Sequence, residues 1–168
     1  MRVVAIALSF VAFAAQAASP LLHPESAEFT KPAPAVSRLT LQTSKGDVVV
    51  EVTRAWAPLG ADRFYNLARL GYYDDMRLHR VSGTKWAQFG INGTPAIAKA
   101  WRTATFPDDP FVPEHSNVRG TIAFAYKEKN ARTTQVFINL QDNAATHDTE
   151  PFVPFGRIVS GKIGRAHV

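Results

Sequence analysis

A series of short β-rich runs around a single helical segment is the feature that most constrains how this chain folds. Runs rich in Val, Ile, Thr and Phe cover residues 39–41, 48–52, 121–125, 134–138 and 155–159, and a further pair lies within 77–95. Such residues favour strands when Gly, Pro, Asn or Asp bound the run. Because no helices alternate with the strands, the pattern predicts an antiparallel barrel or sandwich.

The single helical segment begins near Pro58, a residue that suits the first turn of a helix. Phe64 and Leu67 recur at helical spacing, and Gly71 ends the segment. The apolar face of this helix is expected to cover the sheet. Residues 96–115 are rich in proline and acidic side chains, which indicates a loop without regular sheet.

The N-terminal residues have the pattern of an export signal. Arg2 precedes an apolar run over 3–15, and the letters AQA at 15–17 fit a signal peptidase site. The sequence therefore predicts a signal peptide over 1–17, a periplasmic or secreted protein, and no stable membrane association after cleavage. An uncleaved membrane anchor or a buried helix is the alternative.

The rest of the chain divides by composition. Four prolines fall within 18–37, which favours an extended Pro-rich linker, and the folded domain is expected over 38–161. The last residues, 162–168, read KIGRAHV, which is compatible with read-through into a sequencing adapter. We interpret them as a non-native tail on a truncated reading frame.

Composition excludes several functional classes. The chain has no cysteine, so it forms no disulfide and suits an oxidising compartment. The formal net charge of +5 falls to +2 without Arg2, Lys162 and Arg165, and no basic run alternates with aromatic residues, so nucleic-acid binding is not expected. His115 and His147 lack local partners at metal-ligand spacing, so neither a metal nor another cofactor is expected.

The candidate chemistry lies in the segment RLHRVSGTKWAQFGINGTP, residues 77–95. Arg80 precedes a turn at 82–84, and Trp86 and Gln88 follow on a returning strand, where alternate side chains share a face. A guanidinium, an amide and an indole offer donors and apolar surface. They offer no nucleophile and no base, because arginine stays protonated. The set therefore suits a reaction that breaks no covalent bond.

These residues resemble a known family. LHRV, Gln88 and the glycine turn after it are similar to the FHRV…QGG segment of cyclophilin-type peptidyl-prolyl cis/trans isomerases. RFYNLARLGYYDDMRLHRV, NVRGTIAFA, TTQVFIN and FVPFGRIVSG agree with other family segments in order and spacing. The resemblance covers Leu39 to Gly161, and QFGINGTP is closer to exported bacterial members. It implies an all-β-dominated fold with a closed eight-stranded antiparallel barrel capped by helix. The barrel would be incomplete in this chain if residues 162–168 replace the final strand.

The resemblance also implies roles for individual residues. Arg80 matches the catalytic arginine, which donates to the prolyl nitrogen as the X-Pro bond twists; a solvated arginine paired with a carboxylate is the alternative. Gln88 matches the glutamine that holds the substrate backbone, and Phe137 the phenylalanine at the bottom of the proline pocket. The other substrate-binding residues implied are Trp86, Ala125, Tyr126, Gln135 and Phe152.

Some positions depart from the family pattern. Lys85 stands where the family has a phenylalanine of the proline pocket, and Trp86 stands where it has methionine or another apolar residue. Either a shift of one residue lets Trp86 line the pocket, which we favour, or the pocket is open on one side. Tyr126 replaces an asparagine, and His147 and Asp148 lie near the family's Trp-Leu pair on the far wall.

The function expected from the sequence is acceleration of X-Pro isomerisation during the folding of exported proteins. The expected partners are proline-containing polypeptides, and the chain is expected to act as a monomer. A non-catalytic peptide-binding or chaperone module on the same fold is the alternative left open.

Overall fold

The computed structural model describes residues 19–161 of the chain. The expected signal peptide, 1–17, and the expected non-native tail, 162–168, lie outside the described residues. Within the described range, no helix combines the length and the hydropathy needed to cross a bilayer.

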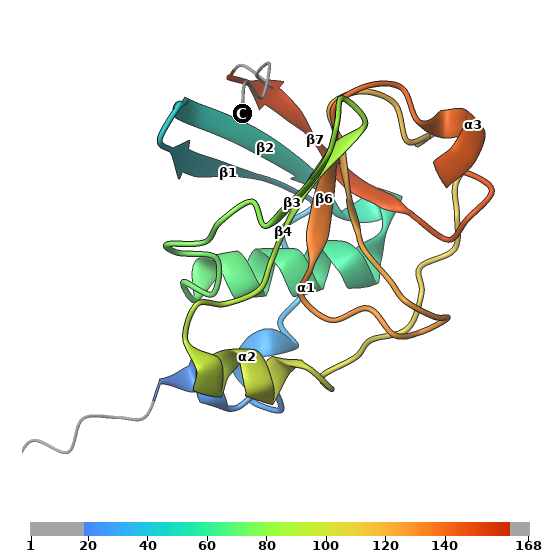
Figure 1. The fold of residues 1–168 in the computed structure, drawn as a ribbon. Coiled ribbons are helices and arrows are strands. Elements are labelled where there is room, and N and C mark those ends of the chain that lie inside the picture. The colour runs from blue at the N-terminus through green and yellow to red at the C-terminus, as the bar shows by residue number, and fades with distance from the viewer. Residues whose placement is uncertain (1–18, 162–168) are drawn as a thin grey trace, which may run out of the picture.

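Seven strands form one sheet in which every neighbouring pair is antiparallel (Figure 1). The strands are β1 (Val36–Thr43), β2 (Gly46–Thr53), β3 (Arg80–Ser82), β4 (Trp86–Phe89), β5 (Thr121–Phe124), β6 (Val136–Asn139) and β7 (Pro154–Ser160). Their order across the sheet is β1-β2-β7-β5-β6-β4-β3. The strands expected from the sequence are therefore present, and the antiparallel, β-dominated class is confirmed.

The described sheet is open, which corrects the expected closed eight-stranded barrel. A barrel closes only when its two edge strands share hydrogen bonds. In residues 19–161, β1 and β3 are the edges, and each pairs with one neighbour, β2 and β4 respectively. The structure thus has seven strands and two free edges where the family resemblance implied eight strands and none.

Helix α1 (Pro58–Arg69) lies where the sequence predicts it and packs against β2 and β7. Its buried face includes Phe64, whose ring centroid lies 4.9 Å from that of Phe155 on β7. Gly71 follows the helix with φ of +77°, a left-handed conformation that glycine adopts at little cost. The main core lies between α1 and the sheet, and its fully buried members include Val50, Val52, Ala61, Phe64, Ile122, Val136 and Phe155.

The N-terminus of α1 is capped from a distant part of the chain. Ala57, the residue before the helix, provides no side-chain cap. Instead, the carboxylate of Asp109 accepts hydrogen bonds from the backbone N–H groups of Leu59 at 2.9 Å and Gly60 at 2.8 Å. These two donors belong to the first helical turn, where backbone N–H groups otherwise lack partners. Burial raises the pKa of Asp109, although both hydrogen bonds act against that rise.

Two short helices lie in segments without predicted helix. Helix α2 (Pro95–Trp101) occupies the start of the range 96–115, which the sequence indicated as loop. Pro95 takes the first helical position, which proline favours, and Trp101 at the last position is buried. The sequence indicated a loop because several prolines follow later in the range. Helix α3 (Ala144–His147) precedes β7.

The N-terminal part of the described chain differs from the expected linker over 18–37. It forms two 3₁₀ turns, Pro20–Leu22 and Ala27–Phe29, beside α1 and α2 (Figure 1). The indole N–H of Trp101 donates to the carbonyl of Leu21 at 2.8 Å, and the Phe29 ring packs edge-on against Trp101 with centroids 4.6 Å apart. The segment is therefore packed on the domain. The sequence did not predict this packing, because the few apolar residues of the segment follow neither a helical nor a strand period.

Candidate active site

A row of directly opposed residues on neighbouring strands forms one side of the candidate site. Arg80 on β3 lies opposite Gln88 on β4, Gln88 lies opposite Phe137 on β6, and Phe137 lies opposite Ala123 on β5. Directly opposed residues of an antiparallel pair project to the same face. The structure thus places the three side chains predicted for catalysis, backbone binding and the proline pocket on one face of the sheet.

The opposite face of the same strands belongs to the core. Ala87 and Phe89 of β4 are buried, whereas Trp86 and Gln88 are half-buried. On β6, Val136 and Ile138 belong to the main core cluster, whereas Phe137 does not. The predicted alternation along β4 is therefore confirmed. Phe137 is buried by other side chains on the site face.

Arg80 is exposed at the edge of this face and is held by an aromatic ring. Its guanidinium carbon lies 4.7 Å from the centroid of the Trp86 ring, within the range of a cation–π interaction. Within residues 19–161 no carboxylate forms an ion pair with Arg80. The N–H groups of the guanidinium are therefore not committed to a protein carboxylate.

The two glutamines of the predicted site contact each other. Gln88 Nε2 donates to Gln135 Oε1 at 2.8 Å, and both side chains are half-buried. This bond fixes both amide planes and leaves the Gln88 oxygen as an acceptor and the Gln135 nitrogen as a donor. An extended peptide backbone presents the complementary groups, a donor and an acceptor, along one edge.

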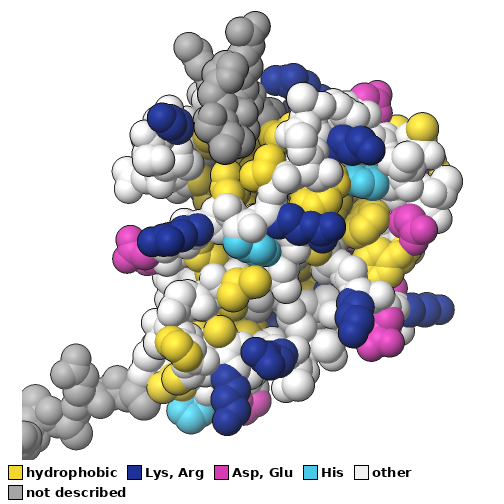
Figure 2. Space-filling model, viewed as in Figure 1, with side chains coloured by type: hydrophobic (Ala, Val, Ile, Leu, Met, Phe, Trp, Pro, Cys, Tyr) yellow, Lys and Arg dark blue, Asp and Glu magenta, His cyan; other side chains and the backbone are white. Residues whose placement is uncertain are grey.

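Aromatic rings surround Phe137 on the site face. Phe152 meets Phe137 edge-on with centroids 5.1 Å apart, and the imidazole of His147 lies 5.3 Å from Phe137 and 5.0 Å from Phe152. We call these three residues the aromatic floor. Figure 2 shows hydrophobic side chains gathering between β6 and α3, beside a histidine and basic side chains.

His147 contributes a neutral ring to the aromatic floor. Burial lowers its pKa, with Asp148 acting in the opposite direction and Lys85 in the same one. Its Nδ1 is buried and has no hydrogen-bond partner in the described structure. The family resemblance placed His147 only near the far wall, because a helix that no local pattern predicted brings His147 to Phe137.

Buried asparagines hold the aromatic floor in place. Asn139 Nδ2 donates to Asn117 Oδ1 at 3.1 Å and to Thr121 Oγ1 at 2.9 Å, and Asn143 Nδ2 donates to Asn139 Oδ1 at 2.7 Å. Asn117 Nδ2 in turn donates to the carbonyl of Phe152 at 2.8 Å. This network ties the end of β6 to the start of α3 and to Phe152, so the segments that carry the three rings are joined by buried hydrogen bonds.

Asp148 extends the asparagine network to the residue after His147. Its carboxylate accepts hydrogen bonds from the backbone and side chain of Asn117 at 2.9 and 2.8 Å, and from Ser116. Burial alone would raise the pKa of Asp148, but these hydrogen bonds bring the pKa below its ordinary value.

Tyr126 connects the aromatic floor to a neighbouring cavity. Its ring packs against Phe152 with centroids 4.9 Å apart, and the guanidinium carbon of Arg132 lies 5.3 Å from its centroid. Its hydroxyl donates to Glu150, which raises the pKa of Tyr126 to about 12. The phenol therefore stays protonated at neutral pH.

A cavity of about 420 Å³ begins where the two glutamines meet. The predicted residues Gln88, Ala125, Tyr126 and Gln135 line it, together with Arg102, Thr103, Thr105, Lys127, Glu128, Ala131 and Thr133. Its volume is within the usual range of ligand sites. Arg102, Thr103 and Thr105 were missed, because they follow the unpredicted helix α2 in a segment that carries no motif.

The structure also bears on the choice between Lys85 and Trp86. Lys85 is exposed in the turn between β3 and β4, and its carbonyl accepts hydrogen bonds from Leu140 N at 2.9 Å and Asn143 Nδ2 at 2.8 Å. Trp86 packs against Arg80, and the ring contacts of Phe137 within the described residues are with His147 and Phe152. Trp86 therefore lies beside the arginine, on the same face of the sheet as Phe137. Whether Trp86 lines the proline pocket or the pocket is open on one side stays a prediction.

Comparisons with known proteins point to one family. The family model described as cyclophilin type peptidyl-prolyl cis-trans isomerase/CLD matches residues 38–163. "Peptidyl-prolyl cis-trans isomerase ppi1" of Schizosaccharomyces pombe is 31% identical over 127 residues, which are 75% of this chain and 81% of that protein. "Peptidyl-prolyl cis-trans isomerase A" of Dickeya dadantii is 30% identical over 74% of this chain and 67% of its own length.

Solved structures agree on the fold. A crystal structure of a Cryptosporidium parvum cyclophilin type peptidyl-prolyl cis-trans isomerase superposes with a TM-score of 0.63 at 22% identity, covering 75% of this chain and 79% of that one. A second crystal structure of that protein, in the presence of the dipeptide Ala-Pro, gives a TM-score of 0.61 at 21% identity over 74% and 80% of the two chains.

Proposed function

Because the chain belongs to the cyclophilin type peptidyl-prolyl cis-trans isomerase family, we propose that it accelerates X-Pro isomerisation on the face formed by Arg80, Gln88 and Phe137. The observation that carries this assignment is the cross-strand row. It aligns a guanidinium without a carboxylate partner, an oriented amide and a buried ring on one surface, facing away from the core.

The reaction requires no covalent chemistry. Rotation about an X-Pro bond meets a barrier of about 18–20 kcal/mol because amide resonance is lost in the twisted state. In that state the prolyl nitrogen becomes pyramidal and regains a lone pair, to which the Arg80 guanidinium donates. Gln88 and Gln135, fixed by their 2.8 Å hydrogen bond, hold the peptide backbone while the proline ring rests on Phe137.

The magnitudes show that several residues must share this work. A rate gain of about five decades needs roughly 7 kcal/mol of differential stabilisation of the transition state. One charge-assisted hydrogen bond contributes about 1.5–3 kcal/mol. The remainder is assigned to removal of water by the aromatic floor and to the fixed amides that hold the flanking peptide.

The substrates proposed are proline-containing polypeptides. The relative from Cryptosporidium parvum was crystallised in the presence of Ala-Pro, which supports an X-Pro dipeptide as a minimal ligand for this fold. The cavity beside Gln88 and Gln135 has room for side chains that flank the proline. We propose that the chain acts on them as a monomer.

The setting proposed is the periplasm or the exterior of the cell, where the chain would assist the folding of exported proteins. The signal-like pattern over 1–17 and the likeness of QFGINGTP to exported bacterial members support it. The test is to fractionate cells that express the full chain and to sequence the N-terminus of the product. A product in the exported fraction that begins at Ala18 supports export, and an uncleaved product in the cytoplasm refutes it.

A protease-coupled assay on a short X-Pro peptide tests the activity. We expect acceleration by the parent chain and a loss of about 10- to 100-fold in kcat/KM for Arg80→Ala. Arg69→Ala, which removes an exposed arginine outside the site, is the control and should retain activity. Peptide binding without acceleration by the parent chain would instead identify a non-catalytic peptide-binding module.

A further inference from the structure

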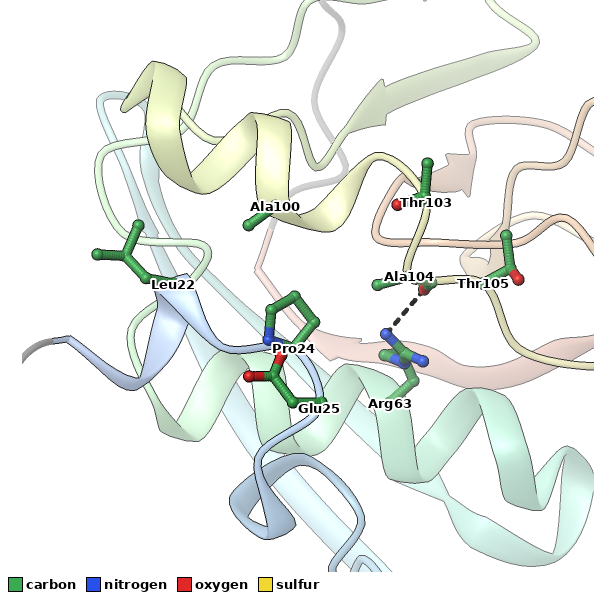
Figure 3. Close-up of a pocket in the computed structure, with 8 residues that line it drawn as sticks. All are labelled: Leu22, Pro24, Glu25, Arg63, Ala100, Thr103, Ala104 and Thr105. Carbon is green, nitrogen blue, oxygen red and sulfur yellow. Dashed lines mark hydrogen bonds between the residues drawn. The ribbon is translucent and has the colours of Figure 1, made fainter.

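A second cavity lies away from the aromatic floor, between the N-terminal segment, α1 and the residues after α2 (Figure 3). Its volume is about 510 Å³. Leu22, Pro24, Glu25, Arg63, Ala100, Thr103, Ala104 and Thr105 line it, and we call it the Arg63 pocket. Because the packed N-terminal segment supplies part of its wall, the pocket depends on the part of the chain that the sequence indicated as linker.

Arg63 is the cation of this pocket, and its charge is unbalanced within the described chain. Neighbouring arginines pair with carboxylates: Arg54 with Asp62 at 2.7 Å, and Arg69 with Glu28 at 3.0 Å. Arg63 forms no ion pair with any carboxylate in residues 19–161.

Arg63 is also held in place. Its guanidinium carbon lies 5.2 Å from the ring centroid of Trp101 and 5.0 Å from that of Phe106, and Nη1 donates to the carbonyl of Ala104 at 3.1 Å. A guanidinium has five N–H donors, and this bond uses one of them. The aromatic contacts and the burial, which lowers the pKa of Arg63, make the group costly to leave without an anion.

The other walls indicate which anion fits. Leu22, Pro24, Ala100 and Ala104 present apolar surface, and Thr103 and Thr105 carry hydroxyl groups. The acidic residue, Glu25, has its carboxylate 3.1 Å from His23 Nδ1, and Figure 3 shows it directed away from Arg63. One guanidinium matches a singly charged carboxylate in charge and in planar, two-pronged geometry. A phosphate group would bring close to two negative charges to a single cation.

We propose that the Arg63 pocket binds a carboxylate group attached to a small apolar body. The guanidinium pairs with the carboxylate, and the apolar walls cover the body. The pocket also adjoins the cavity beside the glutamines, because Thr103 and Thr105 line both. The carboxylate therefore comes either from a free small molecule or from an acidic residue of a bound polypeptide; the second source rests on the proposed isomerase function.

Benzoate, with benzamide as its uncharged analogue, is the probe for this pocket. The full chain contains three tryptophans, so its ¹⁵N-labelled form gives few indole N–H signals, and that of Trp101 lies beside Arg63. We expect benzoate to shift the Trp101 signal saturably and benzamide to leave it unchanged. No saturable shift with benzoate, or an equal shift with benzamide, overturns the proposal even if no variant folds.

Two variants assign the binding to the guanidinium. Arg63→Met keeps an unbranched side chain between the two rings and removes the charge, and it should weaken benzoate binding by about ten-fold or more. Arg69→Met, which removes a cation from the same helix outside the pocket, should bind benzoate as the parent does. Unchanged affinity in a folded Arg63→Met variant overturns the proposal.

Two proline peptides that differ in one residue, Glu or Gln, identify the source of the carboxylate. Tighter binding of the Glu peptide to the parent chain, lost in Arg63→Met, assigns the pocket to an acidic residue of the polypeptide. Equal binding of both peptides, with benzoate still bound, assigns it to a free carboxylate. Benzoate should also bind to Arg80→Ala, so loss of the isomerase function and loss of this pocket are separate outcomes.

Discussion

The aromatic floor and the arginine that faces it are built in opposite ways. Phe137, His147 and Phe152 are tied together by buried asparagines that reach β5, β6 and α3. Arg80 is exposed on a three-residue edge strand and is held by one aromatic ring. In the proposed reaction this difference predicts a division of labour, in which the hydrogen-bonded floor receives the proline ring and the exposed cation donates to the nitrogen as the bond twists.

Breaking the support of the floor should have the largest effect. Asn139→Leu removes the amide that donates to Asn117 and Thr121 and accepts from Asn143, which leaves buried polar groups without partners. We expect it to lower the free energy of unfolding by about 3 kcal/mol, measured by urea denaturation.

The matched control is Thr84→Ala, which removes an exposed side-chain hydrogen bond to Gln141. It should change the free energy of unfolding by no more than about 0.5 kcal/mol. If Asn139→Leu were equally mild, the floor would not depend on the asparagine network.

Removing the ring that holds Arg80 should have a smaller effect, and it should change kcat/KM instead of the free energy of unfolding. Trp86→Leu removes the ring beneath the Arg80 guanidinium, an interaction that contributes about 0.5–1 kcal/mol at an exposed site. We expect kcat/KM to fall by about 2- to 5-fold in the coupled assay. Trp56→Leu, which removes a tryptophan stacked on His115, should leave kcat/KM unchanged. An equal loss in both variants would argue against a specific role for Trp86.

Protonation of His147 should have the smallest effect on the free energy of unfolding. It tests the aromatic floor without changing Arg80. Because burial lowers the pKa of His147, the unfolded chain binds the proton more readily than the folded chain. Stability is therefore fully present above the pKa of an ordinary histidine and is lost as the pH falls through the lower pKa of the folded state. The free energy of unfolding of the parent should decline from pH 7 to pH 5 more than that of His147→Phe. Parallel curves would show that His147 is not buried against Phe137 and Phe152.

The alternation of side chains explains what the sequence could predict. Phe137 was assigned to the site by the family resemblance alone, because β6 pairs with β4 from a distant part of the chain. Arg80 and Gln88 share a face because strand geometry fixes it once the pairing is known, and a short turn joins β3 to β4. The helix over 58–69 was predictable for the same reason, since its period is local. These elements depend on neighbours in the sequence.

The parts that could not be predicted depend on distant contacts. His147 reaches the floor through a four-residue helix whose neighbour Asp148 binds Asn117, and no period marks that helix. The N-terminal segment packs through Leu21, Phe29 and Trp101, which lie far apart in the chain. The open sheet also differs from the closed barrel that the resemblance implied, because pairing between edge strands is a property of the whole sheet.

The cap of helix α1 has a consequence for synthesis of the chain. The backbone N–H groups of Leu59 and Gly60 donate to the Asp109 carboxylate, which lies 50 and 49 residues further along the chain. On a ribosome, the helix therefore emerges with its leading turn exposed to water and gains its cap after Asp109 has left the tunnel. We expect a chain interrupted before Asp109 to have a frayed first helical turn, whereas a chain that includes Asp109 can form the cap once the intervening loop closes.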